Sequence, residues 1–180
     1  MKPLLALLAA PLLAAPSAST TALPYSHDAE AIVRVDCSGG WGSAVKVGVS
    51  TYITAAHVID AGGCTVGGVG ITLTAVDRWN DYATFIGPSS NHVIEPSCDG
   101  FSSGKMYVAR GYAAGFNENV LVPWLATEIV WRAQRLFLAD AAIPGMSGGP
   151  VIDRKGRVVG IVTMRVASRS LPLDATGVCA

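Results

Sequence analysis

Residues 144–150 read Pro-Gly-Met-Ser-Gly-Gly-Pro, so three glycines and two prolines surround one serine. A nucleophilic serine needs its oxygen exposed on a sharp turn, with backbone N–H groups beside it. Glycine permits the unusual dihedrals and the close approach of a substrate that such a turn requires. Neighbouring N–H groups are also what stabilises an oxyanion during acyl transfer. The stretch therefore indicates a catalytic serine, with an ordinary glycine-rich hairpin as the alternative.

Composition sets the outer bounds for the rest of the chain. Of its 180 residues, 51% are hydrophobic and 14% are charged, against about 25% charged in an average chain. A sizeable core is therefore expected, in one ordinary domain or in two small fused barrels. Thirteen basic and thirteen acidic side chains cancel and form no patch or tail, so nucleic acid is not an expected partner.

The N-terminal residues have the features of an export signal. Lys2 gives a positive start, residues 4–15 are apolar, and small residues follow. We predict a signal peptide over residues 1–22, cleaved between residues 15 and 22, and a flexible lead-in over residues 23–30. The apolar run is shorter than the roughly 20 residues of a membrane span. We therefore expect an exported protein, periplasmic or extracellular, with no stable membrane span after cleavage; a retained anchor is the alternative.

Short runs rich in β-branched and aromatic residues, separated by turns, fill most of the remaining chain. They lie at residues 31–35, 43–49, 71–76, 83–86, 106–112, 120–127, 129–138 and 157–164, with a hairpin turning at 154–156. This pattern favours an all-β barrel or sandwich. The polar, turn-rich residues 88–104 are the predicted linker between an N-terminal unit, 31–87, and a C-terminal unit with its tail, 105–180. The glycine-rich residues 62–70 lack the ending of a phosphate-binding loop and are interpreted as a turn beside a short strand.

Four cysteines, Cys37, Cys64, Cys98 and Cys179, are too far apart in sequence for a C-x-x-C zinc or redox pair. In an exported protein an even number suggests disulfides. Three pairings are open, and free buried thiols are the alternative. We expect neither a metal nor a cofactor.

A catalytic serine needs a base, and the base needs a group that orients it. The chain has three histidines. His27 lies in the lead-in and His92 in the predicted linker, where both are most simply solvated. His57 follows a predicted strand that ends at Thr54, on one or two expected helical turns over residues 55–61. It is therefore the candidate base.

Three motifs in chain order resemble the chymotrypsin-like (trypsin-fold) serine peptidases. They are Thr54-Ala55-Ala56-His57, Asp81-Tyr82-Ala83 and Gly145-Met146-Ser147-Gly148-Gly149-Pro150. Residues 140–145 and Gly42-Ser43-Ala44 are more particularly similar to the compact bacterial HtrA/Deg-like branch. The resemblance covers about residues 31–163. It implies two packed six-stranded antiparallel β-barrels with the active site in the cleft between them. No appended PDZ domain is evident, and we expect a monomer.

The resemblance also implies the roles of the site residues. Ser147 attacks a peptide carbonyl, His57 takes its proton and passes it to the leaving amine, and Asp81 holds the imidazole. The backbone N–H groups of Gly145 and Ser147 form the oxyanion hole. Asp77 is the rival to Asp81, which is favoured because it opens a short apolar strand, as the family's Asp-x-Ala does.

Two features depart from the family pattern. Met146 stands where the zymogen-activated trypsins have an aspartate, so we expect an oxyanion hole organised by packing or by substrate binding. The loop into the serine is one residue shorter than in the usual Deg pattern. By resemblance, Ala141 forms the floor of the specificity pocket and Thr163 a wall, which favours cleavage after small or medium apolar residues. A shift of one residue would place Asp140 in the pocket and give basic specificity.

The resemblance also bears on the cysteines. Cys37 and Cys64 would lie on neighbouring loops of the first barrel. Trypsin-like enzymes tie the linker to the tail, so a Cys98–Cys179 disulfide is plausible. Pro172 interrupts the C-terminal helix that usually accompanies such a link, which weakens that pairing.

The sequence as a whole predicts a secreted serine endopeptidase that hydrolyses a peptide or protein substrate through an acyl-enzyme. The sequence argues against an α/β-hydrolase, because that fold needs a histidine after the serine and none follows Ser147. The remaining alternative is a catalytically inactive homologue that acts as a secreted protein-binding module.

Overall fold

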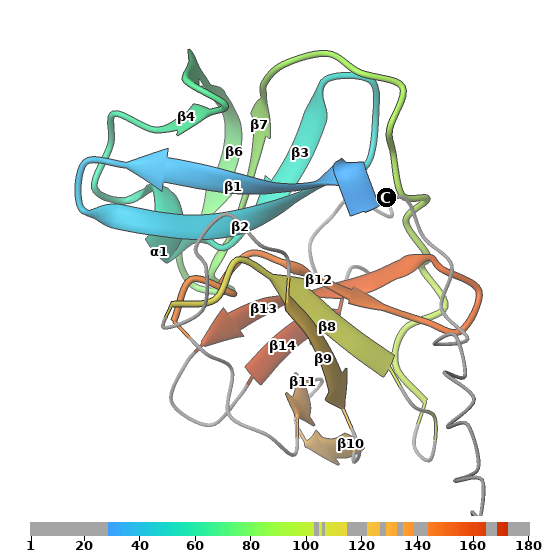
Figure 1. Ribbon diagram of the computed structural model, residues 1–180. Helices are drawn as coiled ribbons and strands as arrows, with labels where there is room; N and C mark the ends of the chain where they lie inside the picture. Colours follow the sequence, from blue (N-terminus) through green and yellow to red (C-terminus); the bar gives the residue numbers. More distant parts are fainter. Residues whose placement is uncertain are drawn as a thin grey trace, which may run out of the picture.

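The computed structural model describes residues 29–102, 105, 107–114, 122–126, 129–132, 135–138, 144–164 and 169–172. For 122–126, 129–132, 135–138, 164 and 169–172 it describes the backbone alone. Within these ranges the chain forms two antiparallel sheets of seven strands each, packed one above the other (Figure 1). The expected all-β fold class is confirmed. The predicted signal peptide lies outside the described residues.

The first sheet comes from the N-terminal half, in the order β5-β4-β1-β2-β3-β7-β6. Its strands are β1 (Ile32–Cys37), β2 (Gly40–Lys46), β3 (Thr51–Thr54), β4 (Thr65–Val66), β5 (Val69–Gly70), β6 (Thr72–Asp77) and β7 (Tyr82–Ile86). A 3-10 turn, Ala29–Ala31, precedes β1, and a four-residue helix α1, Ala56–Ile59, follows β3. The glycine-rich residues 62–70 contain the β4–β5 hairpin, which agrees with their interpretation as a turn beside a short strand.

The second sheet comes from the C-terminal half, in the order β10-β11-β14-β13-β12-β8-β9. Its strands are β8 (Tyr107–Gly111), β9 (Val122–Ala126), β10 (Ile129–Arg132), β11 (Arg135–Leu138), β12 (Pro150–Ile152), β13 (Val158–Met164) and β14 (Arg169–Pro172). The single run expected over residues 129–138 is divided into two antiparallel strands, in which Ile129 pairs with Leu138 and Arg132 with Arg135.

In the described part of the chain, each sheet has seven strands where six were expected. In the first sheet, β4 and β5 are two residues long and too short to show as a periodic run. In the second sheet, one expected run is divided into the strands β10 and β11, and β14 ends on Pro172. Proline has no N–H to donate, so its position at a strand end leaves the ladder intact.

The two sheets share a hydrophobic core. One cluster of buried side chains joins Ile32, Val45 and Ile53 of the first sheet to Ile152 and Ile161 of the second. Ile94, from the segment between the sheets, is buried in the same cluster. The two halves therefore pack directly against each other, which fixes the loops at their boundary.

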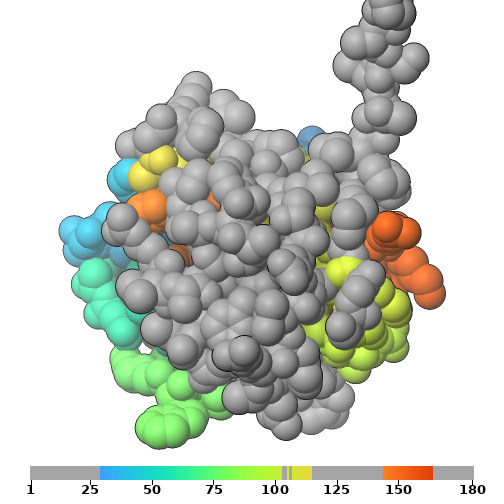
Figure 2. Space-filling model, turned by 90° about the horizontal axis from the view of Figure 1, so that it is seen from below, coloured from blue at the N-terminus to red at the C-terminus, as the bar shows by residue number. Residues whose placement is uncertain are grey.

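The segment that joins the two sheets also contacts the second sheet near the β12–β13 hairpin. Pro96 forms a parallel bridge with Val158, and Asp99 accepts a 2.7 Å hydrogen bond from the Arg157 guanidinium. Seen from below, residues near 100 lie next to the orange β12–β13 hairpin (Figure 2). Within the described ranges, no helix is long and apolar enough to cross a membrane.

Candidate active site

His57 and Asp81 are joined through the imidazole. His57 Nδ1 lies 2.8 Å from Asp81 Oδ2 and 3.0 Å from Oδ1. An ionised carboxylate only accepts hydrogen bonds, so Nδ1 carries the proton and Nε2 keeps its lone pair. The His57 side chain is 47% exposed and that of Asp81 is 19% exposed. The pair therefore presents a basic nitrogen at an accessible surface.

Asp81 also holds the start of α1. The His57 backbone N–H donates to Asp81 Oδ1 at 3.0 Å. Ala55 at the N-cap supplies no side-chain hydrogen bond, so the helix takes its capping acceptor from a distant turn. One carboxylate thus fixes both the ring and the backbone of the candidate base.

The turn before β7 delivers Asp81 in an uncommon conformation. Its φ is +58°, and it is the one non-glycine residue with positive φ in the described part of the chain. Aspartate tolerates this region better than most residues. Asp77 steadies the turn, because its carboxylate accepts hydrogen bonds from the N–H groups of Trp79 (2.9 Å) and Asn80 (3.0 Å). The bond from the Asn80 backbone is the main reason that the pKa of Asp77 is lowered. Asp81, rather than Asp77, contacts the imidazole.

Ser147 lies on a loop of residues 144–149, here called the nucleophile loop, where two glycines have positive φ. Gly145 has φ +88° and Gly148 has φ +81°. A Cβ at Gly145 would lie 2.2 Å from the Tyr112 carbonyl oxygen, and one at Gly148 would lie 2.1 Å from the Ser43 carbonyl oxygen. Both the dihedrals and the lack of space therefore require glycine.

The loop backbone is oriented by its carbonyls. Pro144 O accepts from the Ala114 N–H (2.6 Å) and Met146 O accepts from the Gly149 N–H (2.9 Å). In a trans peptide the C=O and the following N–H point in opposite directions, so the N–H groups of Gly145 and Ser147 point away from these anchors. Neither N–H makes a hydrogen bond within the described residues. The Met146 side chain is buried in a cluster of the second sheet.

One cleft brings the two halves of the candidate site together. His57 and Ser147 line the same hollow of about 340 Å³, with Trp41, Val58 and Gly145 among its walls. Trp41 is held by a 3.1 Å hydrogen bond from its indole N–H to the Tyr112 carbonyl. A second hollow, of about 320 Å³, lies beside the β12–β13 hairpin and is lined by none of the three candidate triad residues.

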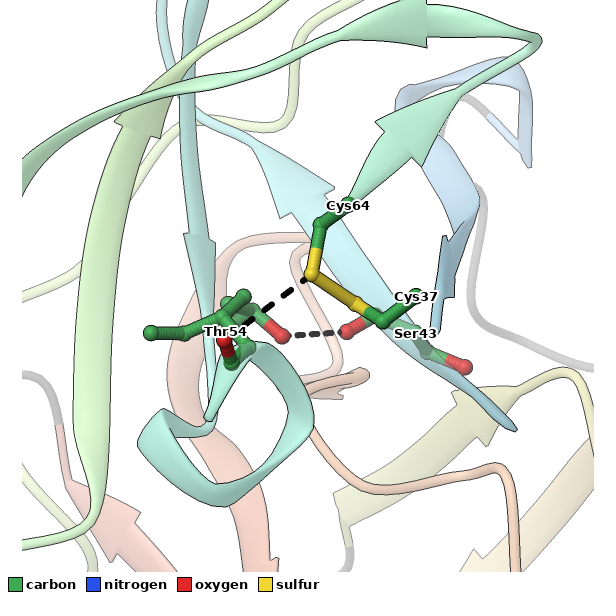
Figure 3. Close-up of a disulfide and its surroundings, with 5 residues drawn as sticks. Cys37, Ser43, Thr54 and Cys64 are labelled. Carbon is green, nitrogen blue, oxygen red and sulfur yellow. Dashed lines mark hydrogen bonds between the residues drawn. A yellow bond between two sulfur atoms is a disulfide. The ribbon is translucent and has the colours of Figure 1, made fainter. Parts of the chain in front are cut away.

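A disulfide joins Cys37, at the end of β1, to Cys64, just before β4 (Figure 3). It closes a loop that contains β2, β3 and α1, and Cys37 borders the cleft. Cys98 is also disulfide-bonded, and no cysteine is free in the part of the chain that the structure covers. Cys179, its implied partner, lies outside the described residues.

The specificity pocket is only partly described. Thr163 is buried on β13, whereas Ala141 and Asp140 lie outside the described residues. The pocket register therefore stays a prediction. Across the described ranges, no three His, Cys, Asp or Glu side chains gather in a metal-binding group.

Sequence reasoning missed the residues that hold the nucleophile loop from outside. The sequence points to Ser43 only through a family-like Gly-Ser-Ala motif, and it gives no sign of Trp41 or Tyr112. The signal for Ser43 would be a serine in a strand that is buried on both faces. The strand β2 is buried continuously from Gly42 to Lys46.

Comparison with known proteins identifies the family. The profile of the Trypsin-like peptidase domain matches residues 42–161. A protein named "Serine protease HtrA-like" from Staphylococcus epidermidis is 30% identical over 147 residues, covering 67% of this chain and 25% of that protein. Its counterpart from Staphylococcus aureus is 26% identical over 110 residues, covering 51% of this chain and 14% of that protein. The chain thus spans a quarter or less of the length of these relatives.

Solved structures share the fold. A serine endoprotease from Yersinia pestis superposes with a TM-score of 0.71 at 20% identity, covering 85% of this chain and 62% of that one. The Rv3671c protease of M. tuberculosis in an inactive form gives a TM-score of 0.66 at 19% identity, covering 82% of this chain and 86% of that one. With a family profile that covers two thirds of its residues, the chain belongs to the trypsin-like peptidase domain family.

Proposed function

We propose that the chain is an exported serine endopeptidase that uses Ser147, His57 and Asp81. The observation that carries the proposal is the 2.8 Å contact between His57 Nδ1 and Asp81, on a histidine that shares a cleft with Ser147. Membership of the trypsin-like peptidase family supports the same roles.

The first half of the proposed reaction forms an acyl-enzyme. Ser147 Oγ attacks the carbonyl carbon of the scissile peptide while His57 Nε2 takes the hydroxyl proton. The carbonyl oxygen becomes an oxyanion that accepts hydrogen bonds from the N–H groups of Gly145 and Ser147. The C–N bond then breaks, and the leaving amine takes the proton from His57. Asp81 stabilises the imidazolium in between.

The second half of the reaction hydrolyses the acyl-enzyme and regenerates the free enzyme. Water gives a proton to His57 Nε2 and attacks the acyl carbon, and collapse of the second oxyanion releases the acid and re-protonates Ser147. Oxyanion-hole donors of this kind contribute about 10²–10³-fold to turnover each. A hole kept in shape by packing fits the burial of Met146 in the second sheet.

We further propose cleavage after small or medium apolar residues, from the Ala141 floor and the Thr163 wall of the implied pocket. Export to the periplasm or the cell exterior is supported by the N-terminal signal pattern and by the Cys37–Cys64 disulfide, since disulfides persist in oxidising compartments.

A labelled fluorophosphonate tests the proposal directly. The wild type should be labelled, Ser147→Ala should not, and His57→Ala should fold normally but react far more slowly. Lack of labelling of the folded wild type, or equal labelling of Ser147→Ala, would reject catalysis and leave the inactive binding module. Peptide-library cleavage read by mass spectrometry then tests the pocket preference.

A further inference from the structure

We propose that Ser43, on β2 of the first sheet, is a positioning residue that fixes the backbone of the nucleophile loop in the orientation of a working oxyanion hole. The inference rests on the proposed function, because it concerns how that site is held. It assigns a role in the reaction to a side chain that lines neither the cleft nor the implied pocket.

Two bonds from Ser43 grip the loop on either side of Met146. The Ser43 backbone N–H donates to Ser147 O at 2.8 Å, and its hydroxyl donates to Gly145 O at 2.7 Å. Ser43 is 0% exposed, so no bulk water competes for these carbonyls. The Ser43 carbonyl in turn accepts a 2.7 Å hydrogen bond from the Thr54 hydroxyl (Figure 3). This bond connects Ser43 to β3, the strand that precedes His57.

The direction of the hydroxyl bond is fixed by its second partner. The Tyr112 N–H donates to Ser43 Oγ at 2.9 Å. A backbone N–H can only donate, so Oγ accepts there and its one proton goes to Gly145 O. Two residues further on, the Ala114 N–H donates to Pro144 O at 2.6 Å. Ser43 is therefore connected to both peptide planes that flank Gly145, directly to one and through residues 112–114 to the other.

These planes need such control because Gly145 has no Cβ and a φ of +88°, so rotation of its peptides costs little. Rotation would turn the Gly145 N–H away from the cleft and a carbonyl toward it. A carbonyl dipole at the position of the developing oxyanion removes a donor and repels the charge. Loss of the Ser43 hydroxyl removes the partner of the part-buried Tyr112 N–H and of the buried Gly145 C=O. Rotation of the Gly145–Met146 peptide would let this carbonyl reach another donor.

The test is Ser43→Ala, with turnover expressed per active site titrated by a fluorophosphonate. We expect kcat to fall about 10–100-fold with KM within twofold. The inhibition constant of a peptide aldehyde, whose adduct places an oxyanion in the hole, should rise by the same factor as kcat falls. A merely structural role would lower the titratable fraction and leave kcat per site and the aldehyde affinity unchanged.

Tyr52→Phe is the matched control. It removes a 2.7 Å hydrogen bond from another buried side chain of the same sheet, to Pro88 O. Neither residue lines the cleft, so kcat should be unchanged. Should Ser43→Ala fail to fold, Ser43→Cys keeps a weak donor at the same place and should give an intermediate kcat.

Wild-type kcat per site and wild-type aldehyde affinity in the folded Ser43 variant would overturn the inference. A fall in kcat for Tyr52→Phe as large as that for Ser43→Ala would also overturn it. Absence of labelling in the wild type overturns the proposed function itself, and the inference with it, so the two failures are distinguishable.

Discussion

Replacing Cys37 and Cys64 by alanine opens a covalent loop with a sequence separation of 27 residues. In the chain-entropy treatment, a cross-link that closes a loop of this length lowers the entropy of the unfolded chain enough to stabilise the fold by about 3.5 kcal/mol at 25 °C. For a chain of this size, that corresponds to a fall in Tm of about 7–14 °C. The loop contains α1 and the strands β2 and β3 that lead to it. Opening it therefore restores conformational freedom to much of the N-terminal half in the unfolded state.

The assay is urea unfolding at 25 °C, followed by tryptophan fluorescence, of the wild type, Cys37→Ala, Cys64→Ala and the double variant. Substitution is preferable to thiol reduction, because a reductant would also break the disulfide of Cys98. Each single variant already removes the cross-link. Each should therefore lose nearly the full 3.5 kcal/mol or so, and the double variant little more.

Additivity is the result that would refute this reasoning. If the losses of the two single variants sum to that of the double variant, side-chain packing rather than the cross-link supplies the stability. A double variant less than about 1 kcal/mol below the wild type would likewise show that the unfolded chain gains little freedom when the loop opens.

Three further predictions concern single positions. Asp81→Asn should lower kcat by about 10⁴-fold with the fold intact, since an amide turned toward Nδ1 favours the wrong imidazole tautomer; peptide hydrolysis measures it, and a fall under tenfold contradicts the role. Burial lowers the pKa of Lys46, so the unfolded state binds more protons and stability should rise with pH toward about 10.4. Lys46→Met should abolish that rise and change stability at pH 7 by less than about 1 kcal/mol, because Pro88 O keeps its bond from Tyr52; urea unfolding at pH 7 and pH 9 checks both. Gly148→Ala, whose Cβ would meet the Ser43 carbonyl at 2.1 Å, should cost about 3–5 kcal/mol in the same assay, and a wild-type midpoint would contradict the geometry.

Most strands could be predicted from the local pattern of apolar residues. Runs such as residues 71–76 and 157–164 alternate or are continuously apolar, and they coincide closely with β6 and β13. Where strands are two residues long, as in β4 and β5, there is no periodicity to detect. The strand β14 was missed because Pro172 suggests a break, although a proline at the end of a strand disturbs no ladder hydrogen bond.

The candidate catalytic residues could be predicted from the sequence, because serine, histidine and glycine at these spacings rarely occur together for another reason. The residues that position them could not be predicted. The Ser43–Gly145 hydrogen bond spans 102 residues of sequence, and a serine in a strand is usually solvated. Likewise, the positive φ of Asp81 follows from a turn that Asp77 closes. Such features depend on how the two sheets pack, which no local window of sequence contains.

The core cluster that Ile32, Val45 and Ile53 share with Ile152 and Ile161 has a consequence for the integrity of the molecule. Each half also has a buried cluster of its own, but this shared cluster is buried only when the halves are together. Unfolding is therefore expected to be cooperative across the boundary, with a single transition. A backbone nick between the halves, near Asn91, would leave two fragments that remain associated through this interface, whereas either fragment alone would expose it and aggregate.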